Sequence, residues 1–505
     1  MNLAPEFESF AKIYRAGGPQ VLSRRLVADL ETPVSAFLKL GEGQENAFLL
    51  ESVQGGETRG RYSIIGLKPD LIWRCRGDVA EINHRALAGG GTFIAEKAAP
   101  LESLRALIGA TRMELPAGLP PMATGLFGYL GYDLVRQIEH LPNAPPDHLG
   151  LPDAILLRPT IIAIFDTVKD EIVVVTPVWP DRDLDARTAY TRAGERIEDA
   201  VAALDRALPP SAEAPADMTP GSKIDSNMTK SEYFSVVTRA KDYIKAGDIF
   251  QVVPSQRFRR PFELPPFSLY RALRRLNPSP FLYYLAFPGF SIVGSSPEIL
   301  VRLRDGKVTI RPIAGTRPRG ATPEKDLALA EELIVDPKER AEHLMLLDLG
   351  RNDVGRVAKI GAVKVTSSFF IERYSHVMHL VSNVEGEIRP GLDVVDALAA
   401  GLPAGTLSGA PKIRAMQIID EFEKEKRGPY GGAVGYFGAD GSMDTCIVLR
   451  TALVKDGMMY VQAGGGVVAD SDPEAEYQET VNKARALMAA AEEAVRFASS
   501  VKKGQ

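Results

Sequence analysis

The segment from Leu208 to Asn227 constrains the fold most, because it offers almost no large apolar side chain to a core. It reads LPPSAEAPADMTPGSKIDSN, and such enrichment in Pro, Ala and Ser is typical of linkers. A chain of 505 residues has room for roughly two to four domains. We therefore predict an N-terminal domain over residues 1–207, a linker over 208–228 and a second domain over 229–495.

Local patterns on both sides of this linker predict a mixed fold. Residues 160–166 and 171–179 are β-branched apolar runs around a short turn, which is typical of a hairpin. Residues 188–208 read as an amphipathic helix, and another begins at the capping box TKSE (Thr229 to Glu232) and ends at Gly247. Because strands and helices do not alternate regularly, we expect an α+β fold with mostly antiparallel sheets.

Composition excludes several classes of protein. A net charge of −5 does not suit a nucleic-acid binder, and no apolar run approaches the ~20 residues that span a bilayer. Cys75 and Cys446 stand in unrelated contexts, so we expect neither a disulfide framework nor a cysteine metal site. The first residues lack the features of a signal peptide. We expect a cytoplasmic protein with no nucleic-acid or membrane partner.

Two pairs of glutamates share the same spacing on two expected helices. Glu339 and Glu342 lie in DPKERAEHL, and Glu476 and Glu479 lie in PEAEYQET. Residues three apart share one helix face, so two such helices could build a site made of oxygen ligands, which suits Mg²⁺. For either pair alone, a solvated helix face is the alternative.

Other segments are suited to an anionic substrate. Gly464, Gly465 and Gly466 follow an expected strand, where bare backbone lets an anion approach; a tight strand-to-loop connection is the alternative. Arg450 lies in an apolar strand, and its planar guanidinium suits a carboxylate. Tyr430 could add a hydroxyl. His376 and His379 are candidates for a catalytic imidazole, although packing is the commoner role of a lone histidine.

Nine motifs, in order from about Gly247 to Thr480, resemble those of the chorismate-utilising enzymes, and most closely the large subunits of anthranilate synthases. They are GDIFQVVPSQRF, NPSPFLYYL, GSSPE, PIAGTRPRG, KERAEHLMLLDLGRNDVGRV, HVMHLVS, PAGTLSGAPK, GPYGGAVGY and QAGGGVVADSDPEAEYQET. The resemblance implies a two-domain fold in which mostly antiparallel sheets pack as a sandwich with helices outside.

The resemblance also implies a role for each matching residue. One Mg²⁺ would lie between Glu342 and Glu479, with Glu339 and Glu476 nearby, and would hold the ring carboxylate of chorismate. The implied catalytic residues are His379, Glu298, Glu339 and Thr406, with Glu298 assisting departure of the C4 hydroxyl. The implied substrate-binding residues are Gly315, Thr316, Tyr430, Arg450, Gly464, Gly465, Gly466 and Lys483, with Tyr430 and Arg450 on the enolpyruvyl carboxylate.

Two positions favour ammonia as the attacking group. Gln251 stands where isochorismate-forming relatives carry a lysine that activates water, and Ala314 stands where aminodeoxychorismate synthases usually carry a nucleophilic lysine. We therefore expect conversion of chorismate to 2-amino-2-deoxyisochorismate and then to anthranilate and pyruvate. A 4-amino-4-deoxychorismate synthase component and a non-catalytic ligand-binding homologue are the alternatives.

The resemblance further implies two partners. Since neither cysteine sits in a Gly-Cys-Gly type turn, ammonia should come from a separate glutamine amidotransferase subunit, in a heterodimer or heterotetramer. The motifs FLLES and NPSPFLYYL resemble the L-tryptophan feedback site of the family, with contacts from Glu51, Ser52, Pro280, Phe281 and Leu282. The alternative is that FLLES is only a buried strand end.

Overall fold

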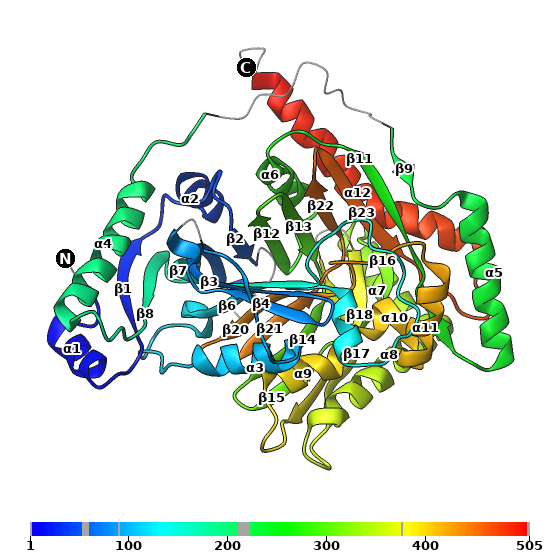
Figure 1. The fold of residues 1–505 in the computed structure, drawn as a ribbon. Helices are drawn as coiled ribbons and strands as arrows, with labels where there is room; N and C mark the ends of the chain where they lie inside the picture. The colour runs from blue at the N-terminus through cyan, green and yellow to red at the C-terminus, as the bar shows by residue number, and fades with distance from the viewer. Residues whose placement is uncertain (1–2, 53–59, 89–90, 211–222, 375–376, 502–505) are drawn as a thin grey trace.

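The computed structural model describes residues 3–52, 60–88, 91–210, 223–374 and 377–501 (Figure 1). Its α-helices are α1 (Phe7–Arg15), α2 (Pro33–Leu40), α3 (Pro100–Ala110), α4 (Ala186–Leu204), α5 (Lys230–Ala246), α6 (Pro266–Leu276), α7 (Pro323–Val335), α8 (Pro337–Val357), α9 (Val394–Gly401), α10 (Gly405–Ser408), α11 (Lys412–Phe422) and α12 (Pro473–Val501).

The strands form one connected hydrogen-bonded network, apart from a small pairing of β10 with β19. They are β1 (Gln20–Val27), β2 (Ala47–Glu51), β3 (Tyr62–Arg76), β4 (Val79–Asn83), β5 (Ile94–Ala95), β6 (Gly125–Leu130), β7 (Ala154–Asp166), β8 (Glu171–Val178), β9 (Asp225–Ser226), β10 (Gln251–Val252), β11 (Ser255–Pro261), β12 (Phe281–Phe287), β13 (Phe290–Ser296), β14 (Ile299–Arg304), β15 (Lys307–Ile310), β16 (Ile313–Pro318), β17 (Lys364–Arg373), β18 (Val377–Glu387), β20 (Ala433–Gly438), β21 (Met443–Ile447), β22 (Thr451–Lys455) and β23 (Met458–Gly464), with β19 at Gly409–Ala410.

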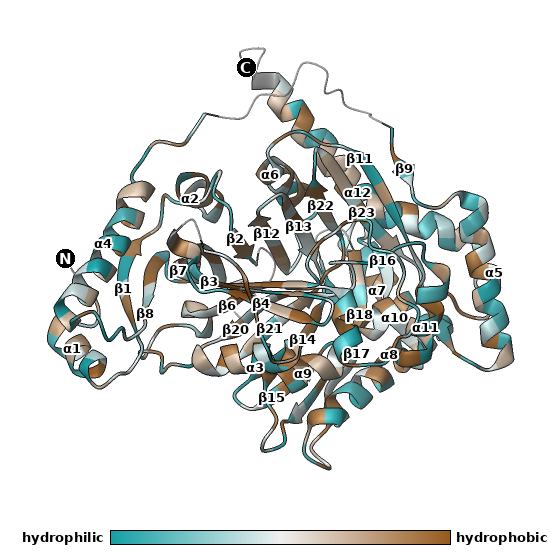
Figure 2. Cartoon of the chain, viewed as in Figure 1, coloured by the Kyte–Doolittle hydropathy of each residue, from teal (hydrophilic) through white to brown (hydrophobic). Residues whose placement is uncertain are grey.

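The expected α+β class with antiparallel sheets is confirmed. Three long pairings, β3 with β7, β1 with β8 and β17 with β18, are all antiparallel. Figure 1 shows the sheets at the centre and helices such as α4, α12, α5 and α9 around them. Figure 2 shows apolar residues concentrated on the strands, whereas α4 and α5 alternate polar and apolar residues, as expected of helices with one face in water.

The local predictions hold to within a few residues. β7 and β8 form the expected hairpin, and α4 begins two residues before the predicted helix and ends four residues before its predicted end. Thr229 and Glu232 form the capping box of α5, and Gly247 ends the helix at φ +84°. The left-handed conformation there favours glycine.

The two sides of the predicted linker share sheets. β2 pairs with β12, and β6 pairs with β20. Residues 211–222 of the predicted linker lie outside the described residues, and its end forms β9, which pairs with β11. Any functional site near these pairings therefore draws on residues from both sides of the predicted linker.

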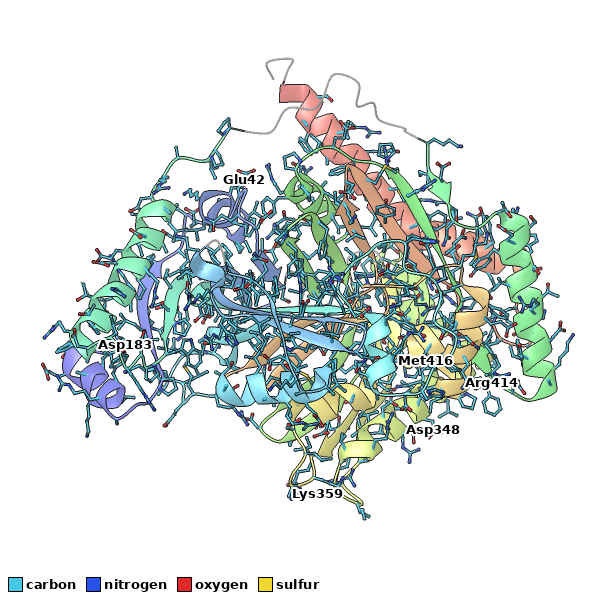
Figure 3. The ribbon with its side chains drawn as sticks, in the orientation of Figure 1. Glu42, Asp183, Asp348, Lys359, Arg414 and Met416 are labelled. Atoms are coloured by element: carbon cyan, nitrogen blue, oxygen red, sulfur yellow. The ribbon has the colours of Figure 1, made fainter. Side chains whose placement is uncertain are left out.

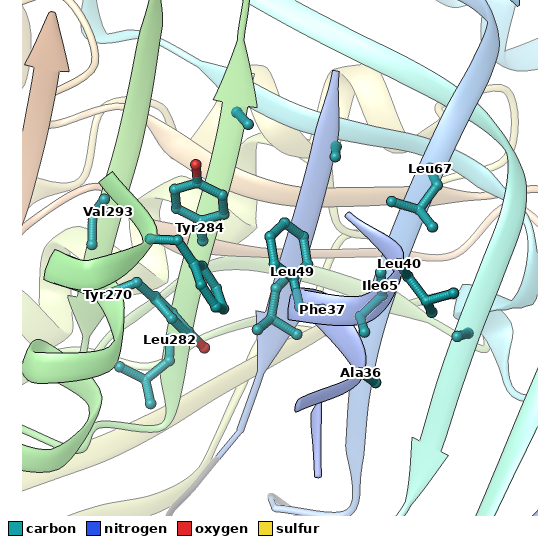
Figure 4. Packing of buried hydrophobic residues seen from close by; sticks show 14 of the residues in the cluster. Ala36, Phe37, Leu40, Leu49, Ile65, Leu67, Tyr270, Leu282, Tyr284 and Val293 are labelled. Carbon is teal, nitrogen blue, oxygen red and sulfur yellow. The ribbon is translucent and has the colours of Figure 1, made fainter. Parts of the chain in front are cut away.

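A core of aromatic and aliphatic side chains also joins the two sides of the predicted linker. Phe37 of α2 packs with its ring centroid 4.5 Å from that of Phe267 and 5.4 Å from that of Tyr284, and Figure 4 shows Phe37 between Tyr284 and Leu40. Burying aromatic rings of this size contributes on the order of a few kcal/mol each.

Charge lies mainly at the outside of the molecule. Figure 3 shows Asp183 and Asp348 at the periphery, where both are exposed, whereas Met416 of α11 is fully buried. No helix in the described part of the chain is long and apolar enough to cross a bilayer. Buried charges are therefore exceptions, and some of them, such as Glu298 and Glu476, belong to the site described next.

Candidate active site

Two helices bring the acid pairs to one region. α8 carries Glu339 and Glu342 and packs on β16 and β18, whereas α12 carries Glu476 and Glu479 and packs on β23. Burial raises the pKa of Glu342, and the negative charges of Glu339 and Glu479 raise it further. Because charges influence one another strongly only at short range, Glu342 of α8 and Glu479 of α12 lie near each other.

Two of the four carboxylates already have cationic partners. Arg317 donates from Nη1 to Glu339 Oε1 at 3.1 Å, and Lys483 Nζ lies 2.7 Å from Glu479 Oε1. No three acidic, His or Cys side chains of the described residues converge as a ready-made metal site. Holding a cation here would require Glu479 to exchange Lys483 for the metal.

The remaining pair retains free coordinating capacity. Glu476 is 9% exposed; its Oε1 accepts from Ser471 at 2.7 Å, and its buried Oε2 has no hydrogen-bond partner among the described residues. Burial raises the pKa of Glu476. A buried carboxylate oxygen without a partner destabilises the fold unless a cation or a hydrogen-bond donor binds it. The carboxylate oxygens of α8 and α12 therefore fit a hard cation.

The glycine loop approaches these acids closely. A Cβ on Gly465 would lie 2.8 Å from Glu476 Oε2, and a Cβ on Gly466 would lie 2.7 Å from Gln251 Nε2. A Cβ on Gly464 would lie 3.1 Å from the Tyr430 hydroxyl, and the N–H of Gly465 donates to the Pro254 carbonyl at 3.3 Å. The loop therefore serves mainly to bring bare backbone against the acids, Gln251 and Tyr430.

Glu298 is a buried carboxyl group close enough to Arg450 and Lys483 for their charges to act on it. It is 7% exposed, and Thr406 donates from Oγ1 to its Oε1 at 3.3 Å. Burial raises the pKa of Glu298 to about 8, although Arg450 and Lys483 nearby oppose the shift. At neutral pH Glu298 carries a proton, as a general acid must.

His379 has the opposite character. Its Nδ1 donates to the Gly315 carbonyl at 3.0 Å and lies 3.1 Å from Thr316 Oγ1, while its buried Nε2 has no partner among the described residues. Burial, helped by the charge of Arg450, lowers the pKa of His379 to about 4. The imidazole is neutral at pH 7 and presents a lone pair on Nε2. His376 lies outside the described residues.

The backbone conformation at position 315 favours glycine. Gly315 lies at a bulge between β16 and β18 with φ +59°, a left-handed conformation. A Cβ there would lie 3.0 Å from Glu339 Oε2. The bulge exposes the carbonyl that orients His379.

Arg450 and Tyr430 offer groups for a carboxylate. Arg450 has φ +49°, and no described residue forms a hydrogen bond or ion pair with its guanidinium. Burial lowers its pKa, opposed by Tyr374 and Glu298. Tyr430 is buried, which raises its pKa to about 12, so its hydroxyl stays protonated. A half-buried, unpaired guanidinium is a ready receptor for an anion.

The sequence reasoning missed residues that orient these groups. Arg427, immediately before GPYGG, is fully buried, pairs with Glu423 and lies 5.5 Å above the Tyr430 ring. Tyr374 packs its ring edge-on to His379 at 5.4 Å. The arginine beside a glycine-rich motif was a usable signal, whereas nothing in the local sequence marks Tyr374.

A separate cavity lies where the two sides of the linker meet. It has a volume of about 330 Å³ and is lined by all five residues of the predicted effector site, namely Glu51, Ser52, Pro280, Phe281 and Leu282. The Glu51 carboxylate accepts from Tyr270 and from Arg274 Nη2, the latter at 3.1 Å. This volume is within the range of small-molecule sites.

Comparisons with known proteins show the family of this chain. The model of the chorismate binding enzyme family matches residues 45–489. Anthranilate synthase component 1 of Cereibacter sphaeroides is 62% identical, with 97% of this chain and 98% of the relative covered. Its counterpart in Pseudomonas aeruginosa is 49% identical over 96% of this chain and 98% of the relative.

Solved structures show the same fold. The crystal structure of anthranilate synthase component I from Streptococcus pneumoniae superposes with a TM-score of 0.74 at 35% identity, covering 92% of this chain and 99% of that one. The isochorismate synthase MenF of Escherichia coli, at 19% identity, has a TM-score of 0.69 over 96% of this chain and 100% of that chain. The chain belongs to the family of chorismate binding enzymes.

Proposed function

We propose that the chain is the chorismate-converting component of an anthranilate synthase. The observation that carries the proposal is a protonated buried acid, Glu298, in the same site as the unpaired guanidinium of Arg450. Hydroxide leaves poorly without a proton donor, and a dianionic substrate needs a cation to hold it beside an acid. The full-length relatives named anthranilate synthase component 1 support the same function.

The first step replaces the C4 hydroxyl of chorismate by an amino group at C2. Arg450 and the Tyr430 hydroxyl bind the enolpyruvyl carboxylate, and Lys483, whose Nζ donates to the Gly464 carbonyl at 2.9 Å, is a further substrate-binding residue. Ammonia forms a bond to C2, the ring double bonds shift, and the C4–O bond breaks. Glu298 gives its proton to the departing hydroxyl, which leaves as water.

The second step forms anthranilate. The intermediate, 2-amino-2-deoxyisochorismate, loses the proton on C2 while the C3–O bond breaks and pyruvate departs. His379 Nε2 is unprotonated and unpartnered, so it can accept that proton. The gain of aromaticity makes this step favourable.

Magnesium fits the carboxylate donors of α8 and α12. Glu342 and Glu479 would hold it, with Glu339 and Glu476 nearby, and the unpartnered Glu476 Oε2 supports this assignment. When bound, Mg²⁺ supplies positive charge that neutralises and orients the ring carboxylate.

The choice of nucleophile rests on two side chains. Gln251 lies against Gly466 with a buried amide, and an amide has no pKa with which to deprotonate water. Ala314 offers no nucleophile at its position in β16. Both support ammonia over water or an enzyme lysine, and they argue against an isochorismate synthase and a 4-amino-4-deoxychorismate synthase component.

Ammonia must come from elsewhere. Cys75 and Cys446 are buried and free, and burial raises the pKa of Cys75 to about 12 and that of Cys446 even further. Neither forms the thiolate that glutamine hydrolysis needs. A glutamine amidotransferase subunit is therefore the partner we infer.

The 330 Å³ cavity is the site we assign to L-tryptophan as feedback inhibitor, in a pathway whose first committed step is this reaction. Because β2 and β12 contribute lining residues from both sides of the predicted linker, an occupant can influence how the two parts pack.

Activity of the purified chain tests the proposal. With chorismate, Mg²⁺ and ammonium sulfate at raised pH, we expect anthranilate, detected by its fluorescence and identified by mass. Glutamine in place of ammonium should give no product. Glutamine-dependent activity of the lone chain, or 4-amino-4-deoxychorismate or isochorismate as product, contradicts the proposal.

The pH dependence of kcat tests the role of Glu298. Its acid form is the active one, so at constant free ammonia kcat should fall as pH rises through about 8. Glu298→Gln should lower kcat by about 10²–10⁴-fold and remove this decline. Glu474→Gln, an exposed glutamate of α12 that pairs with Lys230, is the control. A decline that persists in Glu298→Gln assigns the acid elsewhere.

Ser52→Phe tests the effector site. The larger side chain should fill the cavity and exclude L-tryptophan, so the ratio of rates with and without tryptophan should stay near one. Ser231 is an exposed serine of α5, and Ser231→Phe is the control. In the wild-type chain and in this control, tryptophan should lower the rate at least about tenfold. Equal inhibition of all three proteins contradicts this assignment.

A further inference from the structure

Two chain segments separate the 330 Å³ cavity from a smaller cavity beside Glu298. In the first segment, Pro297 lines the large cavity alone, and Ile299 lines both cavities. Glu298, between them, lines the small cavity, whose volume is about 30 Å³. Successive side chains of extended chain point to opposite sides, so this wall is one chain thick.

The second segment alternates in the same way. Arg311 and Ile313 line the large cavity, whereas Ile310 and Pro312 line the small one. The backbone N–H of Ile313 lies close enough to the Glu298 carboxyl group to lower its pKa. The wall of the large cavity therefore borders the acid.

Few other contacts hold the Glu298 side chain. Thr406 donates to it at 3.3 Å, and the Ile447 N–H fixes its backbone carbonyl at 3.0 Å. The charged groups that face it are Arg450 and Lys483, and neither forms a hydrogen bond with it among the described residues. Across the small cavity lies Asp353, which pairs with Lys412 at 2.8 Å.

Building on the proposed function, we propose that Ile299 and Ile313 are positioning residues for Glu298. Their side chains face the effector cavity and support the wall that places the carboxyl group against the C4 hydroxyl of chorismate. An occupant of the cavity acts on Glu298 directly through this wall, in addition to any effect on how the two parts of the chain pack.

Core-truncating variants test the positioning role. Ile313→Ala and Ile299→Ala should lower kcat about tenfold with KM for chorismate changed less than about twofold, and the decline of kcat should move by about half a pH unit. If alanine prevents folding, Ile313→Val and Ile299→Val should give smaller changes of the same kind. The matched control is the same substitution at Ile292 of β13, which is fully buried and lines neither cavity.

Calorimetry tests the connection to the effector. L-tryptophan is titrated into the chain without chorismate near pH 8, in two buffers that differ in ionisation enthalpy. Because the wall contacts Glu298, binding should be accompanied by proton exchange, and Glu298→Gln should abolish that exchange.

The outcomes separate the two proposals. A chain that makes no anthranilate refutes the proposed function. If the chain makes anthranilate, the inference is overturned when the Ile299 and Ile313 variants keep the kcat and pH profile of the Ile292 variant. It is also overturned when tryptophan binds without proton exchange, or when Glu298→Gln retains the proton exchange.

Discussion

Like-charged carboxylates brought together by two helices are the constraint on which the site depends. α8 and α12 place Glu342 within reach of the charges of Glu339 and Glu479, and each raises the pKa of Glu342. Such an arrangement is unfavourable alone because the carboxylates repel one another. Arg317 and Lys483 offset part of this repulsion, and a divalent cation would offset the remaining repulsion more completely than two side chains can.

Burial sets opposite protonation states for the acid and the base of the site. The same low-polarity surroundings that raise the pKa of Glu298 lower that of His379, because burial disfavours whichever form is charged. One group therefore holds a proton at neutral pH and the other lacks one. A reaction that first protonates a leaving group and then removes a ring proton needs this pair of states.

Local features of the fold could be predicted from the sequence, and long-range ones could not. The capping box at Thr229, the hairpin of β7 and β8 and the acid pairs on two helices follow from neighbouring residues. The pairing of β2 with β12 depends on residues more than two hundred positions apart. For the same reason, the sequence gives no sign that Arg317 binds Glu339 or that Ile313 lies beside Glu298. The residue roles within the site remain predictions.

Magnesium binding tests most directly whether the two helices act as one site. The chain, held with saturating chorismate but no ammonia, is titrated with Mg²⁺ by calorimetry. The account predicts one ion per chain, bound at least about tenfold more weakly by Glu342→Gln and by Glu479→Gln, with Glu474→Gln unchanged. Equal affinity in all four proteins would contradict it.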